Sequence, residues 1–202
     1  TEFTANYRSR ASRDLKVREG FRNGTYMGSP WKSYNRILTS YSPYVYGGLL
    51  TEKDAGERKL NDFTSGFLLL KTKSPWFKAI GGDYFVEIAQ GITVWRSLAF
   101  SKGLDVIQPA KKSPRGIAPY VSSDESNFFR GGAAVLSLSP FELTAFYSNK
   151  KVDATIDTLG NITSVYGVGS HRTQSELRRR FAAQERAAGG RAGVGELAGD
   201  EG

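Results

Sequence analysis

The chain has 202 residues, of which 28 are Lys or Arg and 20 are Asp or Glu, so its formal net charge at pH 7 is +8. The absence of Cys excludes disulfide scaffolds, Cys-ligated zinc and thiol chemistry, and the single His excludes a His-rich metal centre. A hydrophobic content of 39% with 12% aromatic residues excludes a wholly disordered chain. The longest apolar run, residues 67–70, is too short for a membrane-spanning helix, whereas a membrane β-strand needs only about 9–11 alternating residues.

An alternation of apolar and polar residues with a period of two predicts β-strands through most of residues 1–169. In the first strand, Phe3, Ala5 and Tyr7 share one face, and Arg8 and Arg10 share the other. In chain order, the predicted strands are residues 1–11, 34–41, 44–53, 63–71, 77–88, 134–139, 141–148 and 162–169. Short turns alternate with long loops between them, which is typical of an antiparallel up-and-down meander with one plain rim and one elaborate rim.

The C-terminal segment has a different pattern. Thr173 and Glu176 have the spacing of a capping box, which predicts the start of a helix. We expect a basic helix within residues 171–188, ended by two glycines, and a flexible tail over residues 189–202. The preceding residues 1–170 form the predicted β-segment of about eight strands, with a long loop at 89–130.

The residue types on the two faces of these strands bear on the surroundings of the sheet. In several strands one face carries Arg, Glu, Asp, Asn and Thr, whereas the other face mixes aromatic residues with Ala and Leu. In addition, Tyr and Trp residues gather near the ends of the predicted strands. Aromatic residues at strand ends are typical of the girdles of membrane barrels. The sequence therefore predicts an all-β fold, an antiparallel up-and-down meander that forms part or all of an outer-membrane β-barrel, with a short C-terminal helix. A soluble sheet with one wet face is the alternative.

This interpretation assigns three groups of side chains. The expected lumen-facing residues are Arg8, Arg10, Asp83, Glu87, Ser137, Glu142 and Thr144. The expected lipid-facing residues are Tyr84, Val86, Leu136, Leu138 and Leu143. The long loop is a candidate plug or extracellular cap, and its candidate residues for contact with a polar ligand are Arg96, Lys102, Arg115 and Arg130. A merely solvated loop is the alternative there.

Motifs for catalysis are weak. Residues 81–85 are similar to the GGDEF motif of diguanylate cyclases, but Tyr84 replaces an acid of that motif and no α/β alternation flanks it. Ser170 and His171 are adjacent, but the sequence places no orienting carboxylate or oxyanion site beside them, so a loop before the helix is the simpler interpretation. We predict no catalytic residue, no metal site and no cofactor, and we do not expect an enzyme.

The basic charge supports an alternative function. A charge of +8 with interleaved aromatic residues suits a soluble β domain that binds single-stranded nucleic acid. The Lys and Arg residues are, however, spread over strands and loops, with a single concentration at residues 172–186. Nucleic-acid binding is therefore kept as the second hypothesis and is not supported by this segment alone.

Several stretches in order carry a resemblance to a known family. They include Glu19-Gly20-Phe21-Arg22-Asn23-Gly24, Gly28-Ser29-Pro30-Trp31-Lys32, Glu52-Lys53-Asp54-Ala55-Gly56-Glu57, Asn127-Phe128-Phe129-Arg130-Gly131 and Phe141-Glu142-Leu143-Thr144-Ala145-Phe146-Tyr147-Ser148. Together they resemble the β-barrel region of large Bacteroidota proteins that contain a helix-hairpin-helix domain, a DNA-uptake-like module fused to an outer-membrane barrel.

This resemblance implies location in the bacterial outer membrane, with outer-membrane lipid and other envelope proteins as partners. It implies a role in transport, secretion or surface assembly, and it transfers no catalytic residue. The helix-hairpin-helix part and the further strands of that family have no counterpart in these residues, and neither does a signal peptide. We therefore expect a fragment of a longer barrel and carry no DNA-related role over to it.

Overall fold

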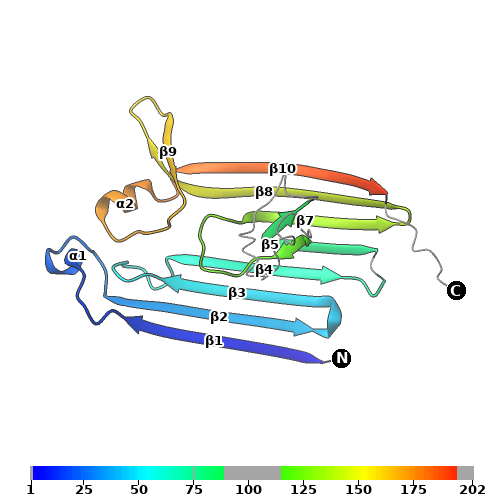
Figure 1. Cartoon of the computed structure of the whole chain (residues 1–202), viewed down its shortest axis with the longest axis horizontal. Coiled ribbons are helices and arrows are strands. Elements are labelled where there is room, and N and C mark those ends of the chain that lie inside the picture. The colour runs from blue at the N-terminus through cyan, green and yellow to red at the C-terminus, as the bar shows by residue number, and fades with distance from the viewer. Residues whose placement is uncertain (1, 75, 89–114, 195–202) are drawn as a thin grey trace, which may run out of the picture.

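One antiparallel sheet organises the computed structural model, which describes residues 2–74, 76–88 and 115–194 (Figure 1). Eight strands follow one another across this sheet in chain order: β1 (Phe3–Arg13), β2 (Trp31–Tyr41), β3 (Val45–Lys53), β4 (Phe63–Lys71), β5 (Phe77–Glu87), β7 (Phe129–Leu138), β8 (Phe141–Ile156) and β10 (Ala183–Val194). Two short strands branch from this path, since β6 (Gly116–Pro119) pairs with β5 and β9 (Ile162–Tyr166) pairs with β8. The predicted all-β antiparallel meander is confirmed.

The helices of the described residues are short: α1 (Glu19–Arg22), the 3-10 turn η1 (Ser42–Tyr44) and α2 (Gln174–Arg179). None of them has the length and apolar character that would let a helix cross a membrane. The capping box predicted for the last helix is present. Thr173 Oγ1 accepts a hydrogen bond from the Glu176 backbone N–H at 3.3 Å, and the Glu176 carboxylate accepts one from the Thr173 N–H at 2.8 Å.

The predicted extent of this helix, 171–188, is wrong, and so is the predicted start of the tail at residue 189; residues 195–202 of that tail lie outside the described residues. Helix α2 ends at Arg179, and β10 pairs with β8 along its whole length, from Ala183 opposite Val152 to Val194 opposite Phe141. The Ala-rich sequence favours a helix, but pairing in the sheet overrides that propensity. Small residues suit the strand because a Cβ at position 189 would lie 2.7 Å from the Phe146 ring.

The sheet is not closed. Among the described residues β1 pairs with β2 alone and β10 with β8 alone, so each has a free side, and the two lie at opposite edges of the sheet (Figure 1). Residues that face each other in an antiparallel pair project to the same side. The register therefore defines an outer face, which carries Ala5, Leu68 and Leu143, and a hollow face, which carries Arg8 and Ile80.

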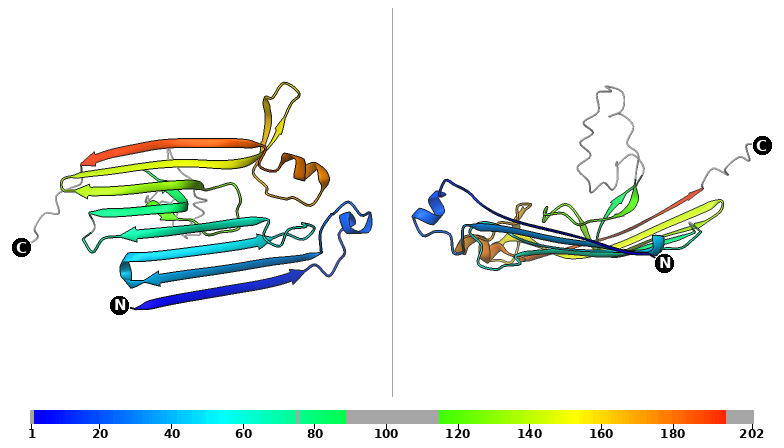
Figure 2. Two further views of the ribbon diagram at one scale, coloured as in Figure 1. Left: turned by 180° about the vertical axis from the view of Figure 1, so that it is seen from behind. Right: turned by 90° about the horizontal axis from the view of Figure 1, so that it is seen from below.

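The core lies on the hollow face. Figure 2 shows the sheet edge-on as one bowed layer, with β6 rising from its hollow side. Ile117 of β6 is fully buried in a cluster with Ile80, Tyr84 and Phe129. A second cluster joins Leu50 and Phe63 of the sheet to Tyr120 and Phe128, whose rings stack at 4.8 Å between centroids.

β5 makes this arrangement possible by leaving the sheet halfway along its length. It pairs with β4 as far as Gly82, and beyond that point its β4 side pairs with β6 instead. Gly82 has a φ of +98°, and a Cβ at this position would lie 2.2 Å from the carbonyl oxygen of Gly66. Both constraints require glycine, so this residue sets where the strand turns toward the hollow side.

The two ends of the sheet differ. The short-turn end holds η1, the β4–β5 turn and the Ser139–Pro140 turn (Figure 1). The long-loop end holds α1, the β3–β4 loop, the segment around Tyr120, and α2 with β9 (Figure 1). This is the predicted pattern of one plain rim and one elaborate rim.

Candidate functional site

The outer face carries no charged side chain at the described positions given next; Lys53, opposite Ser33, and Arg186, opposite Asn149, project to the same side at its long-loop rim. Its positions are the alternate residues of 3–11, 33–41, 45–51, 64–70, 77–81, 132–138, 141–149 and 188–194, beginning with the first residue of each range. Large apolar side chains on it are open to their surroundings; Leu68 is 51% exposed and Leu143 50%. Aromatic residues lie toward its rims, among them Phe3, Tyr41 and Phe141.

The hollow face has the opposite character. Its charged residues are Arg8, Arg10, Lys32, Arg36, Glu52, Lys71, Lys78, Glu142, Lys150, Glu185 and Arg191. β8 displays the contrast within one strand, because Glu142, Thr144 and Phe146 on the hollow face alternate with Leu143 and Ala145 on the outer face.

The predicted lipid-facing residues divide between these two faces. Leu136, Leu138 and Leu143 lie on the outer face. The prediction is wrong for Tyr84 and Val86, which are fully buried on the hollow face. The physical reason is the turn of β5 at Gly82, because beyond it the apolar side of β5 packs with Ile117 of the adjacent β6 against Leu69 and Phe146 of the sheet.

Five of the predicted lumen-facing residues lie on the hollow face: Arg8, Arg10, Ser137, Glu142 and Thr144. Asp83 and Glu87 do not face open space, which corrects their assignment, because both are buried in ion pairs. Asp83 accepts two hydrogen bonds from the Arg130 guanidinium, at 2.7 and 2.8 Å, and one from the Gly66 N–H at 3.2 Å. It thus bridges the gap that β5 leaves beside β4.

The loop prediction is corrected in part. Arg96 and Lys102 lie outside the described residues. Arg130 belongs to β7, and Arg115 immediately precedes β6 and binds the Glu87 carboxylate through its Nε at 2.9 Å. The C-terminal part of the predicted loop therefore contains the strand β6. Its two candidate arginines, Arg115 and Arg130, form ion pairs with Glu87 and Asp83 of β5.

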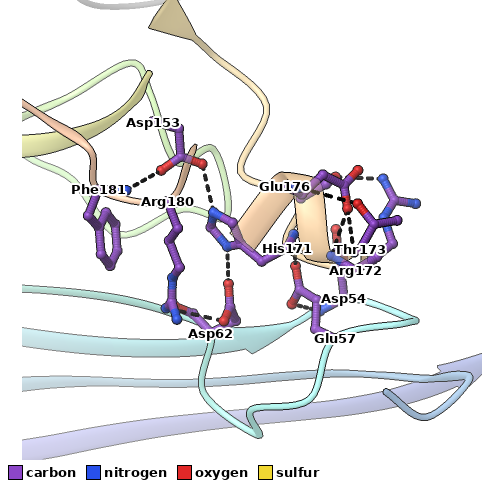
Figure 3. Close-up of polar contacts among 11 residues, drawn as sticks. Asp54, Glu57, Asp62, Asp153, His171, Arg172, Thr173, Glu176, Arg180 and Phe181 are labelled. Atoms are coloured by element: carbon purple, nitrogen blue, oxygen red, sulfur yellow. Dashed lines mark hydrogen bonds and ion pairs between the residues drawn. The ribbon is translucent and has the colours of Figure 1, made fainter. Parts of the chain in front are cut away.

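A polar cluster at the long-loop end joins three distant segments of the chain (Figure 3). His171, which precedes α2, binds the Asp62 carboxylate through Nδ1 and the Asp153 carboxylate through Nε2, the latter at 2.6 Å. Its backbone N–H donates to Glu57 at 3.1 Å, and Arg180 binds Asp62 at 3.1 Å. We call this group the His171 clamp; it ties the β3–β4 loop and β8 to the segment that contains α2.

Charge strengthens the clamp. Burial alone would lower the pKa of His171, but its hydrogen bonds to Asp153 and Asp62 outweigh burial and raise this pKa to about 9. The ring is therefore an imidazolium at neutral pH, held between two carboxylates. Because both ring nitrogens are engaged, His171 is not available as a base for Ser170, whose Oγ accepts a hydrogen bond from Arg172 at 2.6 Å.

The same residues have the composition of a metal site. One potential ligand atom from each of Glu57, Asp62 and His171 lies within 4.8 Å of the others. Each residue already has protein partners, however, since Glu57 accepts hydrogen bonds from the backbone N–H groups of His171 and Asp54. A metal would have to displace the proton from an imidazolium that two carboxylates stabilise. The arrangement acts as an ion-pair clamp.

A cavity of about 230 Å³ lies beside the clamp, between β4, β8, β9 and the segment before β7. The Glu125 carboxylate lines it, and burial raises the pKa of Glu125 to about 8, against the lowering effect of nearby His171. Lys150 is buried at its edge and donates hydrogen bonds to the carbonyl oxygens of Ser126 and Phe128, at 2.5 and 3.0 Å. The cavity thus brings acidic and basic side chains together at the long-loop end.

Sequence patterns give no signal for this cluster. His171 is 109 residues from Asp62 and 18 from Asp153, and none of these spacings matches a motif. Comparisons of this chain with protein-family models, with curated proteins and with solved structures found no match.

Proposed function

We propose that this chain forms part of the wall of a β-barrel in the bacterial outer membrane, with lipid against its outer face and a lumen on its hollow face. Its role is structural, in transport, secretion or surface assembly, without chemistry on a substrate. The observation that carries the proposal is the division of charge, because the outer face is uncharged between its rims while the hollow face carries acids and bases. The resemblance to barrels of Bacteroidota helix-hairpin-helix proteins supports the same assignment.

Strand length and exposure are consistent with this role. The eight main strands have 9 to 16 residues, and a strand that spans a bilayer needs about 9–11. Half-exposed Leu68 and Leu143 would be in contact with water in a soluble protein, at a cost of roughly 25 cal/mol per Å² of apolar surface. In a bilayer, lipid would cover them.

Two adjacent residues of β7 provide the test, because Leu136 lies on the outer face and Ser137 on the hollow face. An arginine that faces lipid costs about 2–4 kcal/mol near the bilayer midplane. We therefore expect Leu136→Arg to reduce the folded fraction after refolding into lipid vesicles, measured by heat-modifiable gel migration. Ser137→Arg, opposite Glu142, is the matched control and should fold as the unmodified chain does.

Equal folding of both variants would contradict the orientation. A chain that stays soluble and monomeric without detergent, and binds single-stranded nucleic acid with a steep salt dependence, would favour the second hypothesis instead.

A further inference from the structure

The cavity beside the His171 clamp is lined by segments that meet only in the folded chain: the start of β4, the loop before β7, the end of β8 and the residues on either side of α2. Its walls are partly aromatic. Phe63 and Phe128 are buried in them, whereas Tyr166 and Phe181 remain 37% and 45% exposed. A concave site with apolar walls and a few polar groups is typical of small-molecule binding.

Most charged side chains of this cavity already have protein partners. The two aspartates of the lining are held by the clamp, since both Asp62 and Asp153 bind His171 (Figure 3). Of the bases, Arg130 is paired with an acid of β5, and Lys150 donates to two backbone carbonyl oxygens. These charges stabilise the fold and are not available to a ligand.

Glu125 differs from these residues. Its carboxylate makes no hydrogen bond or ion pair with any other residue that the structure describes, although it is partly buried. A carboxylate that is removed from water without a donor is destabilised, so a cationic donor in the cavity would stabilise it. The fold also keeps space for this group, because a Cβ at Gly169 would lie 1.9 Å from Glu125 Oε2.

Lys151 supplies a charge of the opposite sign. It lines the same cavity, its side chain is exposed, and within the described ranges it has no ionic or hydrogen-bonding partner. The cavity therefore offers a ligand a partly buried acid at Glu125 and an exposed base at Lys151. A ligand that carries both charges satisfies the two groups together and leaves the net charge of the site unchanged.

The volume of the cavity limits the size of this ligand. Pockets for drug-sized molecules have about 300–1,000 Å³, whereas this cavity has about 230 Å³. We propose that it binds a small zwitterion of the α-amino-acid type. The ammonium group binds the Glu125 carboxylate, the carboxylate faces Lys151, and an apolar side chain lies against the aromatic walls. The site lies at the long-loop end, so the proposal holds whether lipid or water covers the outer face.

Isothermal titration calorimetry of the folded full chain in detergent tests the site, with free leucine and phenylalanine as probes. Leucine is compared with 3-methylbutylamine, which lacks the carboxylate, and with 4-methylpentanoate, which lacks the ammonium group. We expect saturable binding of the amino acids. The acid should bind at least about tenfold more weakly than leucine, because it loses a charged hydrogen bond in a partly buried site. The amine should bind about two- to fivefold more weakly, because its missing partner is exposed.

Variants assign these effects to the two residues. Glu125→Gln keeps the size of the side chain and removes its charge, so leucine should bind at least about tenfold more weakly. Lys151→Met should weaken leucine binding by about two- to fivefold. Glu142→Gln is the matched control, since it removes an acid at the short-turn end, outside the cavity, and should leave binding unchanged. Urea titration of each variant establishes that it is folded.

Two outcomes would overturn the site itself. These are the absence of saturable binding of both amino acids to the folded chain at millimolar concentration, and equal leucine affinity of the unmodified chain and Glu125→Gln. Equal affinity for leucine and 3-methylbutylamine would overturn the zwitterion in favour of a simple cation. All three outcomes leave the proposed barrel intact, because that proposal is tested separately by insertion of the Leu136 and Ser137 variants into vesicles.

Discussion

The two ends of the sheet hold their strands in different ways. At the short-turn end, neighbouring strands are joined by connections such as η1 and the Ser139–Pro140 turn, and β7 and β8 stay paired up to Leu138 and Phe141. At the long-loop end, β5 has left the sheet, and contacts between side chains replace the ladder. Asp83 binds the free N–H of Gly66, and His171 joins loops that lie far apart in the sequence.

This difference shows where the free energy of folding is sensitive to single side chains. Backbone ladders distribute the stabilisation over many residues, whereas a buried ion concentrates it in one contact whose loss leaves a charge without a partner. We therefore expect substitutions at the long-loop end to cost more than substitutions of similar chemistry at the short-turn end.

The largest expected effect is that of Arg130→Ala. Its guanidinium is the ionic partner of Asp83, whose side chain is 2% exposed, and it also donates to the Thr64 carbonyl oxygen at 2.8 Å. Removal of one member of a buried pair costs about 3–5 kcal/mol. The free energy of unfolding, measured by urea titration of the refolded protein in detergent, should fall by an amount near the lower value, because Arg130 itself is partly exposed.

Arg191→Ala is the control at the short-turn end. Arg191 pairs with Glu142 at 3.1 Å, but both side chains are more than 40% exposed. Exposed pairs contribute about 0–1 kcal/mol. An equal cost for the two variants would remove the distinction between the ends.

The next effect depends on pH. The pKa of His171 is raised from 6.5 to about 9, so the clamp contributes its full stabilisation below pH 6.5 and loses it as the pH rises through 9. A shift of this size corresponds to about 3 kcal/mol. We expect the unfolding free energies of the unmodified protein and His171→Gln to differ most near pH 6 and to converge above pH 9, as measured by urea titrations across this range.

The Arg191→Ala protein serves again as the reference, since it retains the clamp and should follow the pH dependence of the unmodified chain. A constant difference between the unmodified protein and His171→Gln from pH 6 to pH 10 would show that the ring is neutral in the folded state.

A smaller effect is expected where the two halves of β5 meet. Gly82→Ala introduces a Cβ at a positive φ and against the Gly66 carbonyl oxygen, at a cost of about 2 kcal/mol. Gly81→Ala is the adjacent control, because a Cβ there has nothing within 4 Å. The same urea titration compares them, and a similar cost at both positions would mean that Gly82 does not set the turn of β5.

The sequence was sufficient to predict the short-turn end. Successive side chains of a strand point to opposite faces, so the alternation of apolar and polar residues at Leu136, Ser137 and Leu143 follows from strand geometry alone. The strands at this end and the faces of their residues could therefore be predicted from neighbouring residues in the sequence. The same rule failed at Tyr84 and Val86. Alternation identifies their face only as apolar, whereas the turn of β5 at Gly82 packs that face against the sheet, in one cluster with Ile117 of β6.

The candidate site was not predictable for a related reason. His171 and Asp62 are 109 residues apart, so their buried ion pair produces no recognisable sequence motif. Both residue types are also common on exposed loops, so neither position stands out by itself. Residues 183–194 illustrate the converse, because their composition favours a helix and only the long edge of β8 makes them a strand.

The smallest expected effect connects a local motif with the long-range clamp. Thr173→Ala removes the cap of α2, at a cost of about 1 kcal/mol. The Glu176 carboxylate also accepts a hydrogen bond from the Arg172 N–H at 2.8 Å, so the start of the helix fixes the backbone next to His171. If the cap positions the clamp, the costs of Thr173→Ala and His171→Gln will not add, and the double variant will differ from their sum by about 0.5 kcal/mol or more in urea titrations below pH 6.5. Strict additivity would mean that the helix start and the imidazolium are independent, and that the β3–β4 loop and β8 alone hold His171 in place.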